Sequence, residues 1–289
     1  MKRIITALIL IPVVLVLVFL GPWWQWLFTM AVAAVAALAA WEFLGLAENA
    51  GAQPPRIAVL VAILALFAGD FEWPGQTAAI LGILSLALLV YCTLFRPVEK
   101  LMADASSSVF CLLYIGFTLL ALPALRESPE GNGPSLVAFL LCAVWAGDSV
   151  ALYVGRAWGR HKMAPTLSPN KTWEGALGSV AGSLLATGAL LGLAHLFAAQ
   201  WDKAWLSYPQ SVSYWMTLAL IVNVAAQVGD LAESALKRSA GVKDSGQDGA
   251  GVLDAGTILP GHGGVLDRID ALLLAAPVLW YALLIHQSF

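Results

Sequence analysis

The feature that most constrains this chain is the recurrence of apolar runs about 20 residues long, separated by short polar segments. The hydrocarbon core of a bilayer is about 30 Å thick, and a helix needs about 20 apolar residues to cross it. Only 11% of the 289 residues are charged, whereas a soluble domain carries about 25%. The runs therefore predict an all-α, polytopic integral membrane protein.

We expect nine transmembrane helices, at residues 4–20, 23–47, 57–69, 76–95, 106–125, 135–158, 173–200, 211–234 and 270–287. The run at 57–69 is short, and the distribution of cationic residues supports its inclusion. With nine spans and a cytoplasmic N-terminus, only Arg126 and Lys203 of the 15 Lys and Arg residues lie outside, as the positive-inside rule requires. The C-terminus is then outside. The first span lacks a cleavage site after it and is expected to remain in the protein.

The two parts of the chain differ in their polar content. Residues 1–134 hold few intramembrane charges, with Glu42 as the main exception, and are expected to be a helical scaffold with a role in dimerisation or lipid entry. Residues 135–289 carry the polar chemistry and are expected to form the catalytic region, at the cytoplasmic face. We expect Glu42 to lie apart from that chemistry. Cys92, Cys111 and Cys142 stand alone in apolar runs, which is typical of small buried hydrophobic residues.

The first polar stretch is WAGDSVALYVGRAWGRHKMAPTLSPNKTWEG, residues 145–175. A carboxylate inside an apolar helix is expensive, so Asp148 is a functional candidate, with a structural hydrogen-bonding role as the alternative. Ser168 and Pro169 are typical of an N-cap followed by the first helical residue. This predicts Lys171 in the first turn of a helix, where a lysine and unpaired N–H groups suit a phosphate. Simple anchoring at the membrane face is the alternative for Lys171.

The second stretch is VGDLAESALKRSAGVKD, residues 228–244. Asp230, Glu233, Ser234 and Lys237 have the spacing of one helical stripe. Glu233 and Lys237 also have the spacing of an ordinary i,i+4 ion pair, worth about 0.2–0.5 kcal/mol. Asp230 has no such local cation and lies deeper in the apolar run, which makes it the better metal candidate.

The third stretch is LPGHGGVLDRID, residues 259–270. Its glycines allow tight turns whose successive N–H groups form anion-binding nests. Asp267 and Asp270 lie on one face of the helix that follows, and Mg²⁺ takes one or two carboxylates together with phosphate oxygens and waters. Arg268 has a guanidinium that can bind a phosphate through two hydrogen bonds. Together the three stretches predict a site for a Mg²⁺-bound nucleotide beside a lipid.

These stretches resemble a known family. The run from Ser234 to Arg238, the segment Lys243-Asp244-Ser-Gly and the stretch 259–270 resemble the signature of CDP-diacylglycerol synthase, also called phosphatidate cytidylyltransferase. The segment GRHKMAPTLSPNKTWEG, residues 159–175, resembles that family's other characteristic stretch. The similarity is specific over about residues 145–275, and the early spans match only as a helical membrane region.

The resemblance implies an integral membrane enzyme that joins CTP to phosphatidate, leaving CDP-diacylglycerol and pyrophosphate. It implies a Mg²⁺ requirement, with a second, monovalent cation such as K⁺ as an option, and a homodimer among membrane lipids. We expect the bacterial inner membrane, an active site facing the cytoplasm and no nucleic-acid partner. One departure is the segment QDGAGVLDAG, residues 247–256, which is inserted between the Asp-Ser-Gly and Leu-Pro-Gly-His parts of the signature. It is either a plain loop or a flap that touches the site.

Within this resemblance we assign Mg²⁺ to Asp230 and Asp267, with Asp270 and Asp148 as second choices. The expected phosphate-binding cations are Lys171, Lys237, Arg238 and Lys243, and Arg268 is expected to stabilise charge on the leaving group. His262 either hydrogen-bonds pyrophosphate or fixes the turn. The other expected substrate-binding residues are Asn170, Ser234, Asp244, Gly263 and Gly264.

Two alternatives remain open at this level. Another lipid-phosphate transferase that uses a nucleotide sugar would need similar groups, and a nucleotide screen separates it from a cytidylyltransferase. A transporter could use Asp148, Asp230 and Glu233 as an ion path. The cationic residues argue against a transporter, because they cluster on one face and do not line a route across the membrane.

Overall fold

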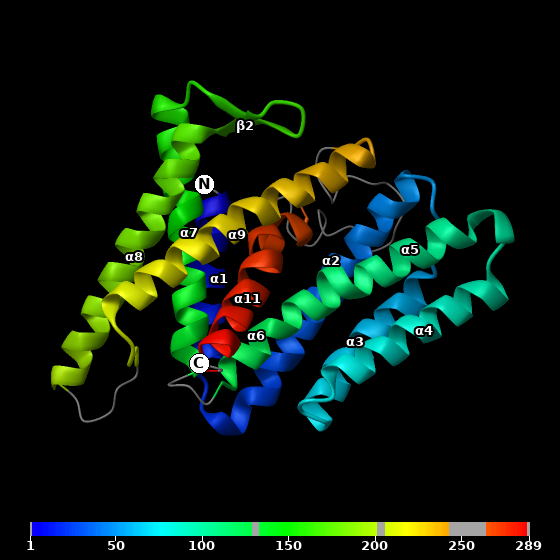
Figure 1. Cartoon of the computed structure of the whole chain (residues 1–289), viewed down its shortest axis with the longest axis horizontal. Helices are drawn as coiled ribbons and strands as arrows, with labels where there is room; N and C mark the ends of the chain where they lie inside the picture. The colour runs from blue at the N-terminus through cyan, green and yellow to red at the C-terminus, as the bar shows by residue number, and fades with distance from the viewer. Residues whose placement is uncertain (1, 129–132, 201–205, 243–263, 288–289) are drawn as a thin grey trace. The chain divides into compact units, whose positions relative to one another are not determined.

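The computed structural model describes residues 2–128, 133–200, 206–242 and 264–287 (Figure 1). The described residues are helical apart from one two-stranded hairpin and short connections, which confirms the all-α class. The chain forms two compact units, each built from segments distant in sequence. The first comprises Met1–Leu120 and Ala235–Ile269, and the second comprises Ala121–Ser234 and Asp270–Phe289. The expected division of roles between residues 1–134 and 135–289 stays a prediction.

The first unit is a group of packed helices. It contains α1 (Lys2–Phe19), η1 (Pro22–Trp24), α2 (Gln25–Asn49), α3 (Arg56–Glu72), α4 (Thr77–Phe95), η2 (Val98–Lys100), α5 (Leu101–Cys111) and η3 (Leu112–Phe117). Helix α2 packs against α3, α5 and η3, and α3 packs against α4 (Figure 1). The core is made of small residues of α2, among them Ala36 and Ala40, and of branched residues such as Ile63 and Ile115. Small residues allow membrane helices to approach closely.

The predicted span at 106–125 is part of a longer helix, Val98–Arg126, that ends in α6 (Thr118–Arg126). Its middle, η3, is a π-helical turn. The Thr118 hydroxyl donates a hydrogen bond to the Tyr114 carbonyl at 2.5 Å, just after that turn. Such turns carry one extra residue and break the regular repeat of a helix.

The second unit contains α7 (Gly133–Trp158), β1 (Lys162–Ala164), β2 (Ser168–Thr172), α8 (Trp173–Gln200) and most of α9 (Val212–Ser239) and α11 (Leu266–Gln287). Helices α7 and α8 pack against each other along much of their length (Figure 1). At one end, buried Trp215 meets Phe139 and Tyr208 edge-on, with centroids 5.2 and 5.0 Å away. Burial raises the pKa of Tyr208, so its hydroxyl stays protonated and donates to the Ser135 carbonyl at 2.9 Å.

The predicted helix start at Ser168 and Pro169 is wrong. Residues Ser168–Thr172 form strand β2, paired antiparallel with β1, and α8 begins at Trp173. The cap is Thr172, whose hydroxyl oxygen accepts a hydrogen bond from the Gly175 N–H at 3.1 Å. The Glu174 carboxylate accepts hydrogen bonds from the backbone N–H groups of Arg160 and His161 at the base of the hairpin. Because the hairpin engages residues 168–172, Lys171 lies on a strand and not in the first turn of a helix.

Among the described residues, seven helices are long and apolar enough to cross a membrane. They are Gln25–Asn49, Thr77–Phe95, Val98–Arg126, Gly133–Trp158, Trp173–Ala199, Val212–Ser239 and Leu266–His286. Helices α1 and α3 lie at the two remaining positions where spans are expected. The protein is therefore a polytopic helical membrane protein.

Candidate active site

The second unit brings together one lysine and three carboxylates, which we call the carboxylate cluster (Asp148, Asp230 and Asp270). Lys171 on β2 forms an ion pair with Asp230 on α9, with Nζ 2.7 Å from Oδ2. Asp148 on α7 interacts electrostatically with Asp230 and Lys171. Asp270 on α11 interacts with Asp230, Asp148 and Lys171. Four elements thus supply a site with three acidic groups and one nearby lysine.

Two glycines allow the helices to meet at this cluster, and each directly precedes one of its carboxylates. Gly229 precedes Asp230, and a Cβ on Gly229 would lie only 2.7 Å from the Asp270 carbonyl oxygen on α11. Gly147 precedes Asp148, and a Cβ there would lie 2.5 Å from the Asn223 side chain on α9. A Cβ at position 229 would meet the α11 backbone and force α9 and α11 apart, whereas one at position 147 would displace the side chains of Asn223, Ser179 and Ser183.

A chain of polar side chains runs between α7, α8 and α9 near the cluster. The Asn223 amide donates to the hydroxyls of Ser179 at 2.9 Å and Ser183 at 2.7 Å. Ser183 in turn donates to the Ala143 carbonyl at 2.5 Å. Gln227, one turn before Asp230, donates to the Asn223 side-chain oxygen at 2.7 Å. Hydrogen bonds of this kind join helices in an apolar surrounding. This chain of polar side chains therefore holds α9, and with it Asp230, in position against α7 and α8.

The sequence pattern of these polar side chains was present but was not used to predict their contact. Asn223 and Gln227 are four residues apart, and so are Ser179 and Ser183. Polar residues at that spacing lie on one face of a helix. Within apolar runs they indicate a helix–helix contact.

The first unit holds a second polar centre at the N-terminus of α11. The carboxylate of Glu42 on α2 accepts hydrogen bonds from the backbone N–H groups of Val265 and Leu266, both at 2.8 Å. Glu42 is buried, with 6% of its surface exposed. The expectation that Glu42 lies apart from the signature is therefore wrong, because sequence separation says nothing about distance between packed helices.

Two predicted site residues pair with each other at the same centre. Lys237 Nζ lies 2.8 Å from Asp267 Oδ1, and both side chains are mostly buried. The Gly264 N–H donates to the other Asp267 oxygen at 3.2 Å. The N–H groups of residues 264–266 thus form an anion-binding turn, and its anions are protein carboxylates. Lys237 neutralises Asp267, and Glu233 is fully buried one turn earlier on α9.

The remaining predicted residues fall into two groups. Asn170 is exposed on β2, Ser234 is half-buried on α9, and Arg238 and Arg268 are exposed near helix ends. Lys243, Asp244, His262 and Gly263 lie outside the described residues, as does the insertion 247–256. The substrate-binding roles assigned to these residues stay predictions.

The carboxylate cluster suits a hard divalent cation. Within the described residues, no three His, Cys, Asp or Glu side chains stand close enough to hold a metal ion by themselves. Mg²⁺ does not require such a group, because it binds one or two carboxylates and completes its shell with waters and phosphate oxygens. The side chain of Asp230 is 38% exposed and Asp148 is exposed, so the cluster is open to such ligands.

Comparisons with known proteins agree with the sequence resemblance. A model of the cytidylyltransferase family matches residues 1–286. A phosphatidate cytidylyltransferase from Pseudomonas aeruginosa is 35% identical over 299 residues, which cover 97% of each chain. One from Synechocystis is 33% identical over 309 residues, covering 97% of this chain and 95% of its own.

A phosphatidate cytidylyltransferase from Brucella melitensis is 44% identical over 169 residues, covering 58% of this chain. This chain therefore spans about half of that relative's length, since the match covers 54% of it.

Proposed function

We propose that this chain, which belongs to the cytidylyltransferase family, transfers a cytidylyl group from CTP to phosphatidate. The products are CDP-diacylglycerol and pyrophosphate. The observation that carries the proposal is the carboxylate cluster with Lys171, in a chain that matches the family along residues 1–286. Relatives that match over most of their length have the name phosphatidate cytidylyltransferase.

The chemistry asks for positioning and charge neutralisation more than for a general base. An oxygen of the phosphatidate phosphate is already anionic and forms a bond to the α-phosphorus of CTP. The bond from that phosphorus to the bridging oxygen breaks, and the electron pair leaves with pyrophosphate. Lys171, which pairs with Asp230 at 2.7 Å, can exchange that partner for a phosphate oxygen. Groups that align and neutralise phosphates supply most of the catalysis in reactions of this type.

Mg²⁺ would be held by Asp230 and Asp270, with Asp148 beside them. This departs from our first assignment, in which Asp267 was the partner of Asp230. Asp270 interacts electrostatically with Asp230, whereas Asp267 is engaged by Lys237. The ion would supply positive charge to the phosphates of CTP. A second, monovalent cation such as K⁺ stays part of the proposal.

We also propose the full topology and assembly. Nine helices cross the bacterial inner membrane, with the N-terminus in the cytoplasm and the C-terminus outside. The carboxylate cluster then lies toward the cytoplasm, where CTP is found, and the protein forms a homodimer. The support is the positive-inside distribution of Lys and Arg.

The first test is a nucleotide screen on the purified full-length protein in detergent micelles. Phosphatidate, Mg²⁺ and each nucleoside triphosphate in turn are supplied, and the lipid product and pyrophosphate are measured. We expect a CDP-lipid and an equal amount of pyrophosphate with CTP, with dCTP as a second substrate to compare. Excess EDTA should abolish turnover, and added Mg²⁺ should restore it.

Two results would contradict the proposal in different ways. Undiminished turnover in EDTA would remove the metal assignment and leave the transfer reaction in place. Absence of a CDP-lipid, together with product formed when a nucleotide sugar replaces the nucleoside triphosphate, would favour the other class of lipid-phosphate transferase. Diacylglycerol in place of phosphatidate is the negative control, because it lacks the attacking phosphate.

A further inference from the structure

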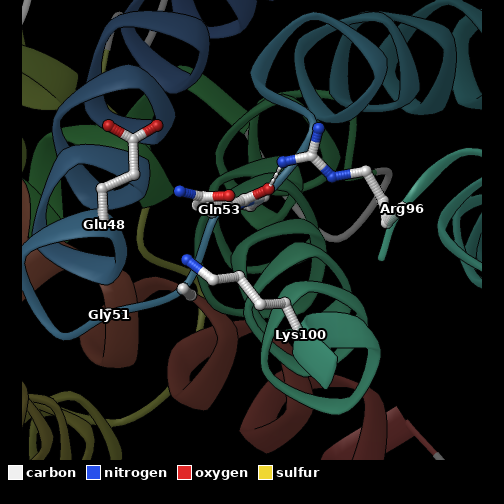
Figure 2. Close-up of a pocket in the computed structure, with 7 residues that line it drawn as sticks. Glu48, Gly51, Gln53, Arg96 and Lys100 are labelled. Atoms are coloured by element: carbon white, nitrogen blue, oxygen red, sulfur yellow. Dashed lines mark hydrogen bonds between the residues drawn. The ribbon is translucent and has the colours of Figure 1, made fainter. Parts of the chain in front are cut away.

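A cavity in the first unit lies apart in sequence from every residue assigned above. Its volume is about 440 Å³, within the range of small-molecule sites, about 300–1,000 Å³. It lies between the loop after α2 and the turn that joins α4 to α5, and its lining includes Glu48, Gln53, Arg96 and Lys100 (Figure 2). On the expected topology both connections face the cytoplasm, at the edge of the membrane.

One cation of this cavity is fixed in place. Arg96 Nε donates to Asp104 Oδ2 at 3.2 Å, and Arg96 Nη2 donates to the Gln53 carbonyl. Asp104 is fully buried and also accepts the Gln53 N–H at 2.5 Å. The Arg96 guanidinium is therefore held against the wall by Asp104 of α5 and by Gln53 of the loop after α2, as Figure 2 shows for Gln53.

Two acidic groups near the cavity, Asp104 and Glu48, are already neutralised. Asp104 pairs with Arg96, and Glu48 accepts two hydrogen bonds from Arg56 at 2.7 and 2.6 Å. Arg56 is itself placed over the Trp41 ring, 4.6 Å from its centroid. Lys100 forms no ion pair within the described residues, and its side chain extends toward Gly51 (Figure 2). The wall of the cavity therefore carries one positive charge more than it carries negative ones.

Exposed apolar residues flank these cations. Val98 and Met102, on either side of Lys100, are 82% and 81% exposed. Phe95 at the end of α4 is 67% exposed, and the buried residues of α4 are only Leu88 and Cys92. A fixed arginine and a lysine that forms no ion pair with the described residues, beside an apolar helix surface, suit a ligand that has an anionic head and apolar tails. A soluble phosphate would use the cations and leave the apolar residues without a partner.

We propose that this cavity binds the phosphate of an anionic glycerophospholipid, whose acyl chains lie along α4 and the turn Val98–Lys100. Lys100 contacts the phosphate directly, and Arg96 supplies a fixed second positive charge. This site takes a phosphodiester lipid, which cannot accept a cytidylyl group. It is therefore independent of the proposed reaction.

The test measures binding of phosphatidylglycerol to the full-length protein in detergent, without nucleotide. Lys100→Gln should weaken that binding about fivefold, which corresponds to about 1 kcal/mol for one lysine at an anionic membrane surface. Lys100→Arg keeps the charge and should bind within about twofold of the parent. The matched control is Lys162→Gln, which removes an exposed lysine from β1 and should leave binding unchanged. Phosphatidylcholine should bind weakly to every variant.

Two further arms decide the source of the phosphate. Glycerol phosphate and inorganic phosphate are added as competitors, and neither should displace the lipid, because neither has acyl chains. Displacement by either compound at concentrations similar to that of the lipid would overturn the lipid assignment. Equal loss of binding in Lys100→Gln and Lys162→Gln would overturn the site. If Lys100→Gln does not fold, the parent protein is tested at high ionic strength. Its binding of phosphatidylglycerol should then weaken, while its binding of phosphatidylcholine should not change. Phosphatidylglycerol binding that is independent of salt would contradict the proposal.

Discussion

The carboxylate of Glu42 caps a helix to which it does not belong. A buried carboxylate is costly unless its oxygens are hydrogen-bonded. Glu42 meets that condition through the N–H groups of Val265 and Leu266. These groups at the start of a helix have no partner within the helix, and the positive end of the helix dipole also favours an anion there. One side chain therefore ties α2 to the N-terminus of α11, from which Asp267 and Arg268 project.

At the residue scale we predict that Glu42→Gln destabilises the protein and lowers its activity. The glutamine keeps the volume, but its NH₂ replaces one acceptor and faces a backbone N–H. A buried donor left without a partner costs about 1–3 kcal/mol. We expect a lower melting temperature in detergent and slower cytidylyl transfer.

The matched control for Glu42→Gln is Glu48→Gln on the same helix. Glu48 is 32% exposed and pairs with Arg56, and pairs near the surface are worth about 0–1 kcal/mol. Its loss should change the melting temperature little. Equal losses of melting temperature in the two variants would show that the hydrogen bonds from α11 to Glu42 stabilise the protein no more than a surface ion pair does.

Among the elements, the crossing of α9 and α11 decides which carboxylates meet. We predict that Gly229→Ala disrupts the active site, since a Cβ would lie 2.7 Å from the Asp270 carbonyl oxygen. Helix α11 must then move, which shifts Asp270 relative to Asp230. A displacement of about 1 Å in a catalytic site can lower the rate about 100-fold. We therefore expect turnover to fall about 10- to 100-fold.

The control for this substitution is Gly192→Ala in α8. A Cβ on Gly192 meets nothing within 4 Å, and alanine favours a helix over glycine by up to about 1 kcal/mol. Gly192→Ala should therefore be neutral or stabilising, with normal turnover. If Gly229→Ala retains full activity, the close approach of the two helices is not needed for the chemistry.

Element positions followed from the apolar runs, but element ends did not. The run that ends near residue 234 belongs to α9, which continues to Ser239 through Lys237 and Arg238. An apolar run marks only the part of a helix that is apolar. The helix itself continues as long as its backbone hydrogen bonds can form. Cations in the last turn are also favourable there. The hairpin before α8 was missed for a similar reason, because Ser168-Pro169 is an equally good start for a helix and Thr172 is the residue that caps it.

For the molecule as a whole, the number of membrane crossings depends on α3. Its 17 residues span about 25 Å at 1.5 Å per residue, which is less than the hydrocarbon core of about 30 Å. The positive-inside distribution nevertheless favours a crossing. The first unit contains α3 in its core, where Ile63 and Leu66 are fully buried.

We predict that α3 crosses the membrane, and fusions to a reporter phosphatase that folds only outside the cytoplasm can test it. A reporter fused after Pro54 should be inactive, and one fused after Gly75 should be active. A fusion at the C-terminus should also be active, because nine crossings from a cytoplasmic N-terminus end outside. An inactive reporter after Gly75 would show that α3 does not cross and that the later spans have the opposite orientation.

The sequence alone determined the membrane class, the approximate position of each helix and the family, because composition, apolar periodicity and signature stretches are local properties. It also identified Asp148 and Asp230 as candidates, since charges within apolar runs are conspicuous, and it identified Lys171 and Asp270 from the polar stretches beside those runs. Only the tertiary structure decided which of these groups meet. Asp270 joins Asp230 because Gly229 admits the α11 backbone, and Glu42 reaches Val265 across 223 residues of sequence. Such contacts depend on how helices pack. Packing depends on the fit between side chains of helices that are distant in sequence, which no local pattern describes.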